Sequence, residues 1–445
     1  MTIEATLPPR PTLGTPRPTV LAPRRREVLP SGMRTALVQS GSVPIVALRL
    51  VVEAGSAHLQ PGQAWLDRLL HDFLREGSAT HDRAAFADAL AAMGGSLDVD
   101  GDEHTTVLRT QVLAEHAAEA ASMLIGLART PRIPAEETAR LVADQQRWAE
   151  IVAQEPAWRA HATFRASLYR GHPYGTVLPQ SETLAAFTAV DARAFWERHT
   201  GAGRATLMAA GKFDAGAVTE AAARASDSWA TPEVPAVQPA HASGSRVVRF
   251  VARPGSEQTT LRVGAPVPPP GHGDYIALEV ANSLLGGSFN SRITQNIREQ
   301  KGYTYSPSSQ ISTRPRDAYW VEAADVTTAV TAPALDEILG EIDRLRAEAP
   351  PEAEVLGITN YVAGISAIRG ATLNGLLDHL EFLALHGLDD SYTAMYEARV
   401  RSVTPADVWR VTRDYLRPER LTIVAVGDAD AVRKDLGRFG DVVEG

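Results

Sequence analysis

An internal repeat restricts the fold of this chain more than any other feature. Residues 188–214 read TAVDARAFWERHTGAGRATLMAAGKFD, and residues 404–430 read TPADVWRVTRDYLRPERLTIVAVGDAD. The segments align without a gap at a separation of 216 positions (404 − 188), close to half of the 445 residues. Both copies show a helical pattern and then an apolar, β-rich run that ends at glycine, so the sequence predicts two duplicated domains. Seven identities share this separation: Thr188/Thr404, Asp191/Asp407, Arg204/Arg420, Thr206/Thr422, Ala209/Ala425, Gly211/Gly427 and Asp214/Asp430.

The composition fits two globular domains and excludes several classes of function. With 44% hydrophobic and 22% charged residues, the chain is about three times the usual domain length and can bury sizeable cores. A net charge of −9 without a basic stripe argues against a nucleic-acid partner. The chain has no cysteine, which excludes disulfides, thiol catalysis and cysteine-based zinc sites. Any chemistry must therefore use histidine, carboxylate or hydroxyl side chains.

The division between the domains is predicted from a stretch rich in proline, alanine, serine and glycine. Residues 231–245 read TPEVPAVQPAHASGS, which is typical of a linker. The first domain then covers residues 24–230 and the second covers residues 246–445. Each is expected to belong to the α+β class, with a largely antiparallel sheet and helices packed on one face.

The N-terminal residues 1–23 are predicted to form a flexible arm. They contain six prolines and no apolar segment of the length that a secretory signal requires. The most apolar stretch of the chain, Ile45 to Val52, has the length of a strand and is interrupted by Arg49. Because this stretch cannot span a bilayer, we expect a cytoplasmic protein.

Two residues of the second domain, Arg298 and Tyr305, carry the functional prediction. Residues 284–309 read LLGGSFNSRITQNIREQKGYTYSPSS, which predicts a helix followed by a strand. A guanidinium at the helix end and a phenol just inside the strand could donate hydrogen bonds to a carbonyl oxygen of an extended peptide. The simpler interpretation is structural, because cations are favoured at helix C-termini and tyrosine is common in strands. The expected details are a cap at Ser288 or Asn290, an apolar side of Phe289, Ile293 and Ile297, a left-handed stop at Gly302, and a strand from Tyr303.

This segment resembles the C-terminal-domain signature of the pitrilysin, or insulinase, family of zinc peptidases, which includes the mitochondrial processing peptidase. The resemblance implies two similar α+β halves per chain. In two-subunit members, an arginine and a tyrosine at this spacing come from the subunit without the zinc motif and hold substrate against the partner's metal. Arg298 and Tyr305 match that pair. Three further stretches resemble the same family, at residues 28–56, 171–175 and 261–275.

The first domain departs from the zinc motif of this family. Catalytic relatives carry His-x-x-Glu-His on a helix, in which two histidines bind zinc and the glutamate activates the metal-bound water. Aligning Gly77-Ser78 with the family's Gly-Thr puts Arg68 at the first ligand, His71 at the general base and Asp72 at the second ligand. The helix predicted to carry these residues spans residues 63–76, and its apolar stripe consists of Ala64, Trp65, Leu66, Leu69, Leu70, Phe73 and Leu74.

The resemblance therefore implies that this chain binds no metal and has no catalytic residue of its own. A permanent cation at Arg68 would repel zinc. Glu150 lies about where the family's distant glutamate ligand is found, but the position seven residues earlier is Ala143. We expect an ion pair between Arg68 and Asp72, spaced i, i+4, that fills the vacated pocket, with Glu150 as a further partner. A residual metal site of Asp67, His71 and Asp72 stays open, although Asp72 is turned by roughly 100° from His71 on the helix.

The function implied by the resemblance is that of the non-catalytic, substrate-binding subunit of a bacterial two-chain zinc metallopeptidase. Its partner, in a heterodimer or heterotetramer, would carry His-x-x-Glu-His and the zinc. Two alternatives remain: a structural or assembly protein of the same fold, and a self-sufficient peptidase with an unorthodox metal site. Residues 95–108 correspond to the strand on which active relatives pair an extended substrate. The acidic residues of this strand also fit a solvated hairpin: Asp98, Asp100, Asp102 and Glu103.

Overall fold

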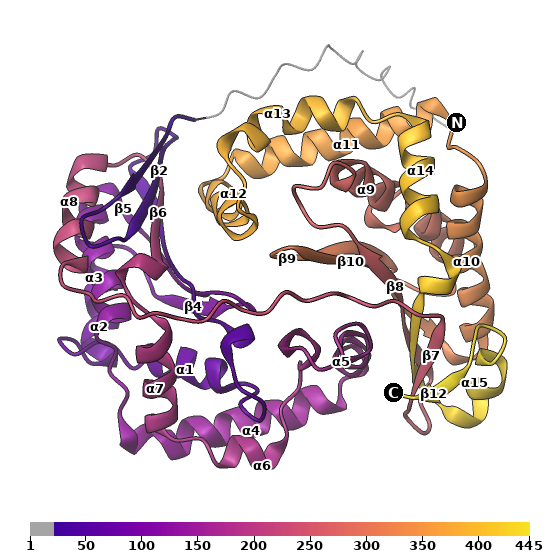
Figure 1. Ribbon diagram of the computed structural model, residues 1–445, viewed down its shortest axis with the longest axis horizontal. Helices are drawn as coiled ribbons and strands as arrows, with labels where there is room; N and C mark the ends of the chain where they lie inside the picture. The colour runs from indigo at the N-terminus through magenta and orange to yellow at the C-terminus, as the bar shows by residue number, and fades with distance from the viewer. Residues whose placement is uncertain (1–21) are drawn as a thin grey trace, which may run out of the picture.

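The computed structural model describes residues 22–445, so the arm predicted for residues 1–23 lies almost entirely outside the described residues. Residues 22–445 form two halves, each built on a six-stranded sheet, which confirms the expected α+β class (Figure 1). The strands of the first half are β1 (Arg24–Val28), β2 (Arg34–Gln39), β3 (Ile45–Val52), β4 (Asp98–Gly101), β5 (Thr106–Leu113) and β6 (Ala205–Gly211). Those of the second half are β7 (Val247–Ala252), β8 (Gln258–Val267), β9 (Ser308–Arg314), β10 (Asp317–Thr327), β11 (Thr422–Gly427) and β12 (Val442–Glu444).

Helices connect the strands in both halves. The helices of the first half are α1 (Leu66–Leu74), α2 (Arg83–Ala92), α3 (Ala117–Arg129), α4 (Thr138–Gln154), α5 (Pro156–Leu168), α6 (Ser181–Ala185), α7 (Ala189–His199) and α8 (Ala215–Ser226). Those of the second half are α9 (Tyr275–Asn282), α10 (Thr331–Ala347), α11 (Glu352–Gly370), α12 (Leu373–His386), α13 (Asp390–Arg401), α14 (Pro405–Tyr415) and α15 (Ala429–Leu436).

The repeat read from the sequence corresponds to equivalent elements. Thr188 caps α7 and Thr404 caps α14, and each accepts a hydrogen bond from the backbone N–H of the aspartate three residues later, at 3.2 Å. The aspartate carboxylate in turn accepts from the backbone N–H of the threonine, so both helices begin with a complete capping box. The identity of Asp214 and Asp430 does not correspond to equivalent positions in the structure. Asp214 caps α8, whereas Asp428, not Asp430, caps α15.

The two sheets are largely antiparallel, with strand orders β1-β2-β6-β3-β5-β4 and β12-β7-β11-β8-β10-β9. Parallel pairing occurs between β2 and β6 in the first sheet, and at β12-β7 and β7-β11 in the second. The central strands β6 and β11 are buried over their whole length. Because β4 and β9 are edge strands, each leaves one row of backbone groups outside the sheet pairing.

One face of each sheet is covered by a helix that comes from the other half of the chain. Helix α5 of the first half packs on β11 and β8 of the second, and α12 of the second half packs on β6 and β3 of the first (Figure 1). Phe164 and Leu168 of α5 belong to one apolar cluster between the halves, and Leu377 and Leu380 of α12 belong to the other. Helices of the same half cover the opposite face of each sheet.

The chain passes between the two halves as an extended coil without helix or strand at residues 229–246 (Figure 1). This coil is attached to both halves, because the backbone N–H of Ser243 donates to the carbonyl of Leu168 at 3.0 Å and that of Ala242 donates to Asp317 at 3.0 Å. The division into domains at residues 24–230 and 246–445 stays a prediction. Among residues 22–445, no helix has both the length and the apolar character needed to cross a membrane.

Candidate functional site

The predicted start of the helix that carries Arg298 is wrong. Helical residues begin at Arg292, so neither Ser288 nor Asn290 caps the helix. Phe289 therefore precedes the helix and is 62% exposed instead of buried. The other two residues of the predicted apolar side, Ile293 and Ile297, are fully buried.

The predicted end of this helix is confirmed, but the strand that follows begins later than predicted. Gly302 adopts the left-handed conformation (φ +64°) that stops the helix. Thr304 forms only an isolated bridge, and the continuous strand β9 starts at Ser308 rather than Tyr303. Tyr305 therefore lies in a short loop, which frees its ring from the sheet.

The helix itself is held firmly against its own half. From Thr294 to Gln300 it is a π-helix, a rare geometry that is frequent at functional sites. The buried side-chain amide of Asn296 donates to Glu337 at 2.8 Å and to Glu341 at 2.7 Å, both on α10. These hydrogen bonds fix the backbone from which Arg298 projects.

Arg298 and Tyr305 do meet, and an additional aromatic residue joins them. The guanidinium carbon of Arg298 lies 5.1 Å from the ring centroid of Tyr305 and 4.7 Å from that of Phe289. These are cation–π distances, and they hold the guanidinium beside two exposed rings. Tyr305 is 81% exposed, so the cluster faces solvent. The sequence prediction missed Phe289 because it placed this residue inside the helix; the adjacent Gly286-Gly287 pair was the available signal for a turn.

The cluster offers hydrogen-bond donors that the chain does not use. Nε of Arg298 lies 3.2 Å from a carboxylate oxygen of Glu299. In the described part of the chain, the terminal nitrogens of Arg298 and the hydroxyl of Tyr305 have no hydrogen-bond partner. A planar guanidinium and a phenol can together bind carbonyl or carboxylate oxygens.

In the first half, α1 carries the residues aligned with the zinc motif. It is shorter than predicted, because Trp65 has a left-handed backbone (φ 72°) that starts the helix at Leu66. The guanidinium of Arg68 lies 4.7 Å from the ring centroid of Trp65 and 5.8 Å from that of Trp158 on α5. Two indoles therefore neighbour the cation at the first ligand position, and no carboxylate of the described residues lies within salt-bridge distance of it.

The expected ion pair between Arg68 and Asp72 is wrong. Asp72 forms a salt bridge with Arg75, at 3.0 Å, and accepts a hydrogen bond from the side chain of Gln145 on α4. Glu150 is exposed on α4 and does not join them. An arginine next to a tryptophan can stack on the ring face while its charge remains hydrated, and this arrangement releases Asp72 to other partners.

His71 and Asp67 are buried beside this position. Nε2 of His71 lies 3.0 Å from the hydroxyl of Thr106, which donates its only proton to the carbonyl of Ala54 at 2.7 Å. His71 must therefore donate from Nε2, so this nitrogen cannot act as a base or bind a metal. Burial lowers the pKa of His71 to about 3 and raises the pKa of Asp67 to about 6, the latter opposed by the charge of Arg68.

Zinc does not fit these residues. Arg68 is a cation, His71 and Asp72 are engaged with protein partners, and Glu150 is exposed on α4. Within residues 22–445, no three histidine, aspartate or glutamate side chains are grouped so that they could hold a metal ion. The alternative site of Asp67, His71 and Asp72 is accordingly not formed in this structure.

Comparison with known proteins connects both halves to one family. The profile described as insulinase (peptidase family M16) matches residues 34–181, and the profile of the peptidase M16 inactive domain matches residues 186–360. The chain belongs to peptidase family M16. An uncharacterized zinc protease of Streptomyces coelicolor is 25% identical over 92% of this chain and 91% of the relative.

Two solved structures have the same fold as this M16 chain. The peptidase M16 inactive domain from Pseudomonas fluorescens superimposes with a TM-score of 0.84 at 20% identity, covering 91% of this chain and 98% of the other. A protease from Helicobacter pylori also has a TM-score of 0.84, at 16% identity, covering 92% of this chain and all of the other. Both comparisons confirm the two-domain fold expected from the sequence.

The acidic side chains of the edge strand β4 and of the turn after it have partners within the M16 chain. Asp98 and Asp100 both form salt bridges with Arg109 of β5, the first at 3.7 Å. Asp102 accepts hydrogen bonds from the backbone of the following turn, and the partly buried Glu103 forms salt bridges with buried arginines of α5 and β9. The acidic residues are therefore structural, and the β4 backbone is also partly engaged, because the carbonyl of Val99 accepts a hydrogen bond from the side chain of Arg75.

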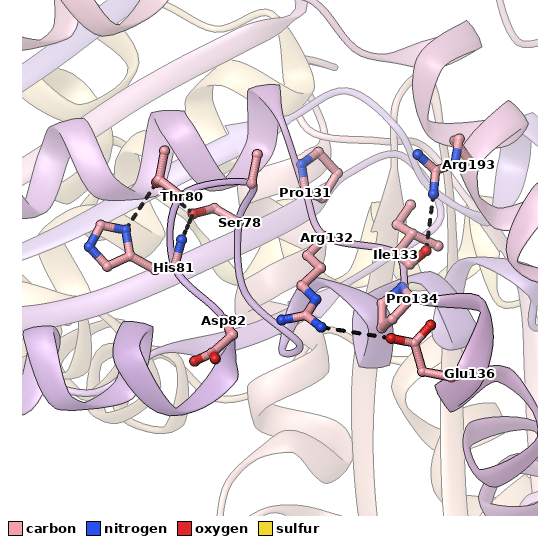
Figure 2. Close-up of a pocket in the computed structure, with 11 residues that line it drawn as sticks. Ser78, Thr80, His81, Asp82, Pro131, Arg132, Ile133, Pro134, Glu136 and Arg193 are labelled. Carbon is pink, nitrogen blue, oxygen red and sulfur yellow. Dashed lines mark hydrogen bonds and ion pairs between the residues drawn. The ribbon is translucent and has the colours of Figure 1, made fainter.

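A small surface pocket lies next to the Gly77-Ser78 turn that anchors the motif alignment (Figure 2). Arg132 and Arg193 reach into it from the far side, but Arg132 lies 3.7 Å from Glu136 and Arg193 donates to the carbonyl of Ile133 at 3.0 Å. Both cations therefore have partners, and we assign no ligand to this pocket.

The buried His71 gives the M16 chain a testable dependence on pH. Its folded-state pKa, about 3, is below the ordinary value of 6.5, so below pH 6.5 the unfolded chain binds a proton that the folded chain does not. Stability is therefore lost as pH falls from 6.5 towards 3, by up to roughly 1.4 kcal/mol per pH unit for this residue. In His71→Gln, urea unfolding should show a loss between pH 7 and pH 5 that is smaller by about 2 kcal/mol.

The matched control is His116→Gln, at the partly exposed turn before α3, which should keep the wild-type dependence on pH. If His71→Gln and the wild type lost the same free energy of unfolding between pH 7 and pH 5, the buried, neutral state of His71 would be contradicted.

Proposed function

We propose that this chain is the non-catalytic, substrate-binding subunit of a two-chain zinc metallopeptidase. The observation that supports the proposal best is the solvent-facing cluster of Arg298, Tyr305 and Phe289 in a chain whose zinc-motif position carries Arg68. A homologous partner with His-x-x-Glu-His would supply the zinc and the hydrolysis. The family profile matched by residues 186–360, an M16 inactive domain, is in keeping with this division of roles.

In this proposal, Arg298 and Tyr305 bind the backbone of an extended peptide. The free terminal nitrogens of Arg298 and the hydroxyl of Tyr305 donate to carbonyl oxygens, and Phe289 and Tyr305 hold the guanidinium in position. Contacts to the peptide backbone do not depend on the side chains of the peptide, so the cluster orients peptides of many sequences in the same way. The π-helix anchored by Asn296 keeps the donors fixed while the substrate exchanges.

The test is peptide hydrolysis by this chain, by a homologous chain with His-x-x-Glu-His encoded beside it, and by their mixture. We expect activity only in the mixture. Arg298→Ala and Tyr305→Phe should each lower kcat/KM of the mixture by about 10- to 100-fold, because each removes hydrogen bonds to the substrate. Tyr305→Phe keeps the ring that stacks on Arg298, so its effect isolates the hydroxyl. Arg253→Ala, an exposed arginine of the same half, is the matched control and should leave the rate unchanged.

Other outcomes would reject the proposal in favour of one of two alternatives. Zinc-dependent hydrolysis by this chain alone would show a self-sufficient peptidase. A stable complex with the partner that hydrolyses nothing would favour a structural or assembly role. We also propose that the complex works in the cytoplasm, which fractionation of cells that express the tagged chain would test.

A further inference from the structure

A large cavity lies in the second half, away from Arg298 and Arg68. Its volume is about 1110 Å³, and it is bordered mainly by α9, α11, α12 and α13, with Gln310 and Ile311 of β9 and Arg24 of the first half also in its wall. Figure 1 shows α11, α12 and α13 arranged around α9 and the end of β9. A volume above 1000 Å³ is enough for a ligand of moderate size.

The most unusual residue of the cavity wall is Glu279 on α9. Its carboxylate accepts a hydrogen bond from the hydroxyl of Tyr396 at 3.2 Å, and the hydroxyl of Tyr275 donates to it as well. In residues 22–445 Glu279 has no salt bridge, and Arg369, on the rim, affects it only at longer range. Burial raises the pKa of Glu279 to about 7, partly opposed by these tyrosine hydrogen bonds. This carboxyl group therefore has no cation within salt-bridge distance in the described part of the chain, and the charge of Arg369 acts on it from farther away.

The hydroxyl of Tyr392 is a second, independent sign of a missing partner. Tyr392 lines the cavity, is only 7% exposed, and its hydroxyl has no hydrogen-bond partner in the described part of the chain. Its ring centroid lies 6.1 Å from that of Tyr396 and 6.0 Å from that of Phe382. A buried hydroxyl without a partner is costly, so native structures rarely keep one unless another group completes it.

Most of the other charged groups of the cavity wall have partners, whereas Arg369 has no ion pair within the described residues. Arg24 forms a salt bridge with Asp390 at 2.7 Å, and His379 forms a hydrogen bond with Thr393. Arg401 forms a salt bridge with Glu397 at 3.1 Å. Glu279 is therefore the acidic group of the wall that has no salt bridge within residues 22–445, since Asp378 pairs with Arg49 and Glu397 with Arg401. A carboxylate surrounded by aromatic rings attracts cations, because each ring presents a negative face.

We propose that this cavity binds an organic cation, an ammonium or guanidinium group, with Glu279 as its counter-ion and Tyr275, Tyr392 and Tyr396 around it. The hydroxyl of Tyr392 accepts a hydrogen bond from the bound N–H group. The proposal concerns a site separate from the Arg298 cluster and does not depend on the proposed peptidase role. The cation can be a small free molecule or a basic side chain of a peptide, since both present the same group.

The test compares a cation with its neutral isostere on the full chain. N-acetylarginine amide and N-acetylcitrulline amide differ in charge but hardly in shape, and calorimetry should detect binding of the arginine form only. Two ten-residue peptides distinguish a free cation from a peptide side chain as the source of the cation. One has a central arginine, and the other has citrulline at that position. Tighter binding of the arginine peptide than of the amide would identify a peptide side chain as the source, whereas equal affinity would identify a free cation.

Variants connect the binding to the cavity. Glu279→Gln keeps an acceptor for the tyrosine hydroxyls but removes the charge, and it should weaken binding of the arginine form at least about tenfold. Tyr392→Phe removes a hydroxyl that has no partner in the free protein, so it should weaken binding without lowering the unfolding temperature. Glu352→Gln, at the exposed start of α11, is the matched control and should bind as the wild type does. Equal binding of the arginine and citrulline forms, no binding of either, or full binding by Glu279→Gln would overturn the proposal.

Discussion

Replacing Glu103 with glutamine is expected to lower the free energy of unfolding by about 3 kcal/mol at pH 7. Glu103 follows β4, and one carboxylate oxygen lies 2.5 Å from Nη1 of Arg165 on α5 and 3.0 Å from Nη2 of Arg314 on β9. The two arginine side chains are 9% and 4% exposed. Without the carboxylate, two buried positive charges would face each other with no counter-ion, which is why the expected loss is large.

The effect should depend on pH with a defined sign. Burial of Glu103 opposes its ionisation, but the charges of Arg314 and Arg165 outweigh burial and lower its pKa to about 2. The ionised carboxylate therefore stabilises the fold above its ordinary pKa of 4.5, and this contribution is lost as pH falls towards 2. Urea unfolding at pH 7 and pH 3 should show the difference between Glu103→Gln and the wild type shrinking in acid.

Glu115→Gln is the matched control, because Glu115 is 76% exposed and its removal should change stability by less than about 0.5 kcal/mol. A wild-type unfolding midpoint for Glu103→Gln at pH 7 would contradict the role given to this carboxylate.

Replacing Phe164 with alanine is expected to cost about 3–5 kcal/mol and to loosen the contact between the halves. Phe164 on α5 is fully buried in the cluster between the halves, with its ring centroid 5.4 Å from that of Tyr319 on β10. Gly264 of β8 leaves room for this ring, because a Cβ there would lie 2.5 Å from it. Removing the ring therefore opens a cavity against the second sheet.

Hydrogen exchange separates this effect from a general loss of stability. In Phe164→Ala, the amides of β8 and β11 in the second half should exchange faster, although the substitution is in the first half. Phe73→Ala removes an equally buried ring from the first half's own core and should leave the β8 and β11 amides protected. Loss of protection at β8 and β11 to the same degree in both variants would show that the halves unfold together, and that α5 does not specifically hold the second sheet.

Local patterns made the duplicated architecture predictable. The capping threonines Thr188 and Thr404 and the apolar runs after them depend on residues a few positions apart, and the structure has them at the expected helices and strands. Such short-range signals survive in the sequence because helix capping and strand burial are decided locally. The same locality explains the correct helix stop at Gly302.

The candidate site was predictable in part. The spacing of Arg298 and Tyr305 and the loss of the zinc motif at Arg68 are visible in the sequence. The contribution of Phe289 was not, because it depends on where the helix starts. The stacking of Arg68 on Trp158 was also hidden, since the two residues are 90 positions apart (158 − 68) and nothing local pairs them.

The sequence by itself determined the family, the two α+β halves, the missing zinc ligands and the Arg298 and Tyr305 pair. Only the tertiary structure decided that each half places a helix on the other's sheet, that Glu103 joins Arg165 to Arg314, and that Glu279 lines a cavity without forming a salt bridge to any described residue. These features depend on packing between residues up to hundreds of positions apart. Periodicity and capping record only the nearest neighbours of each residue, so contacts between distant elements become visible only when the chain has folded.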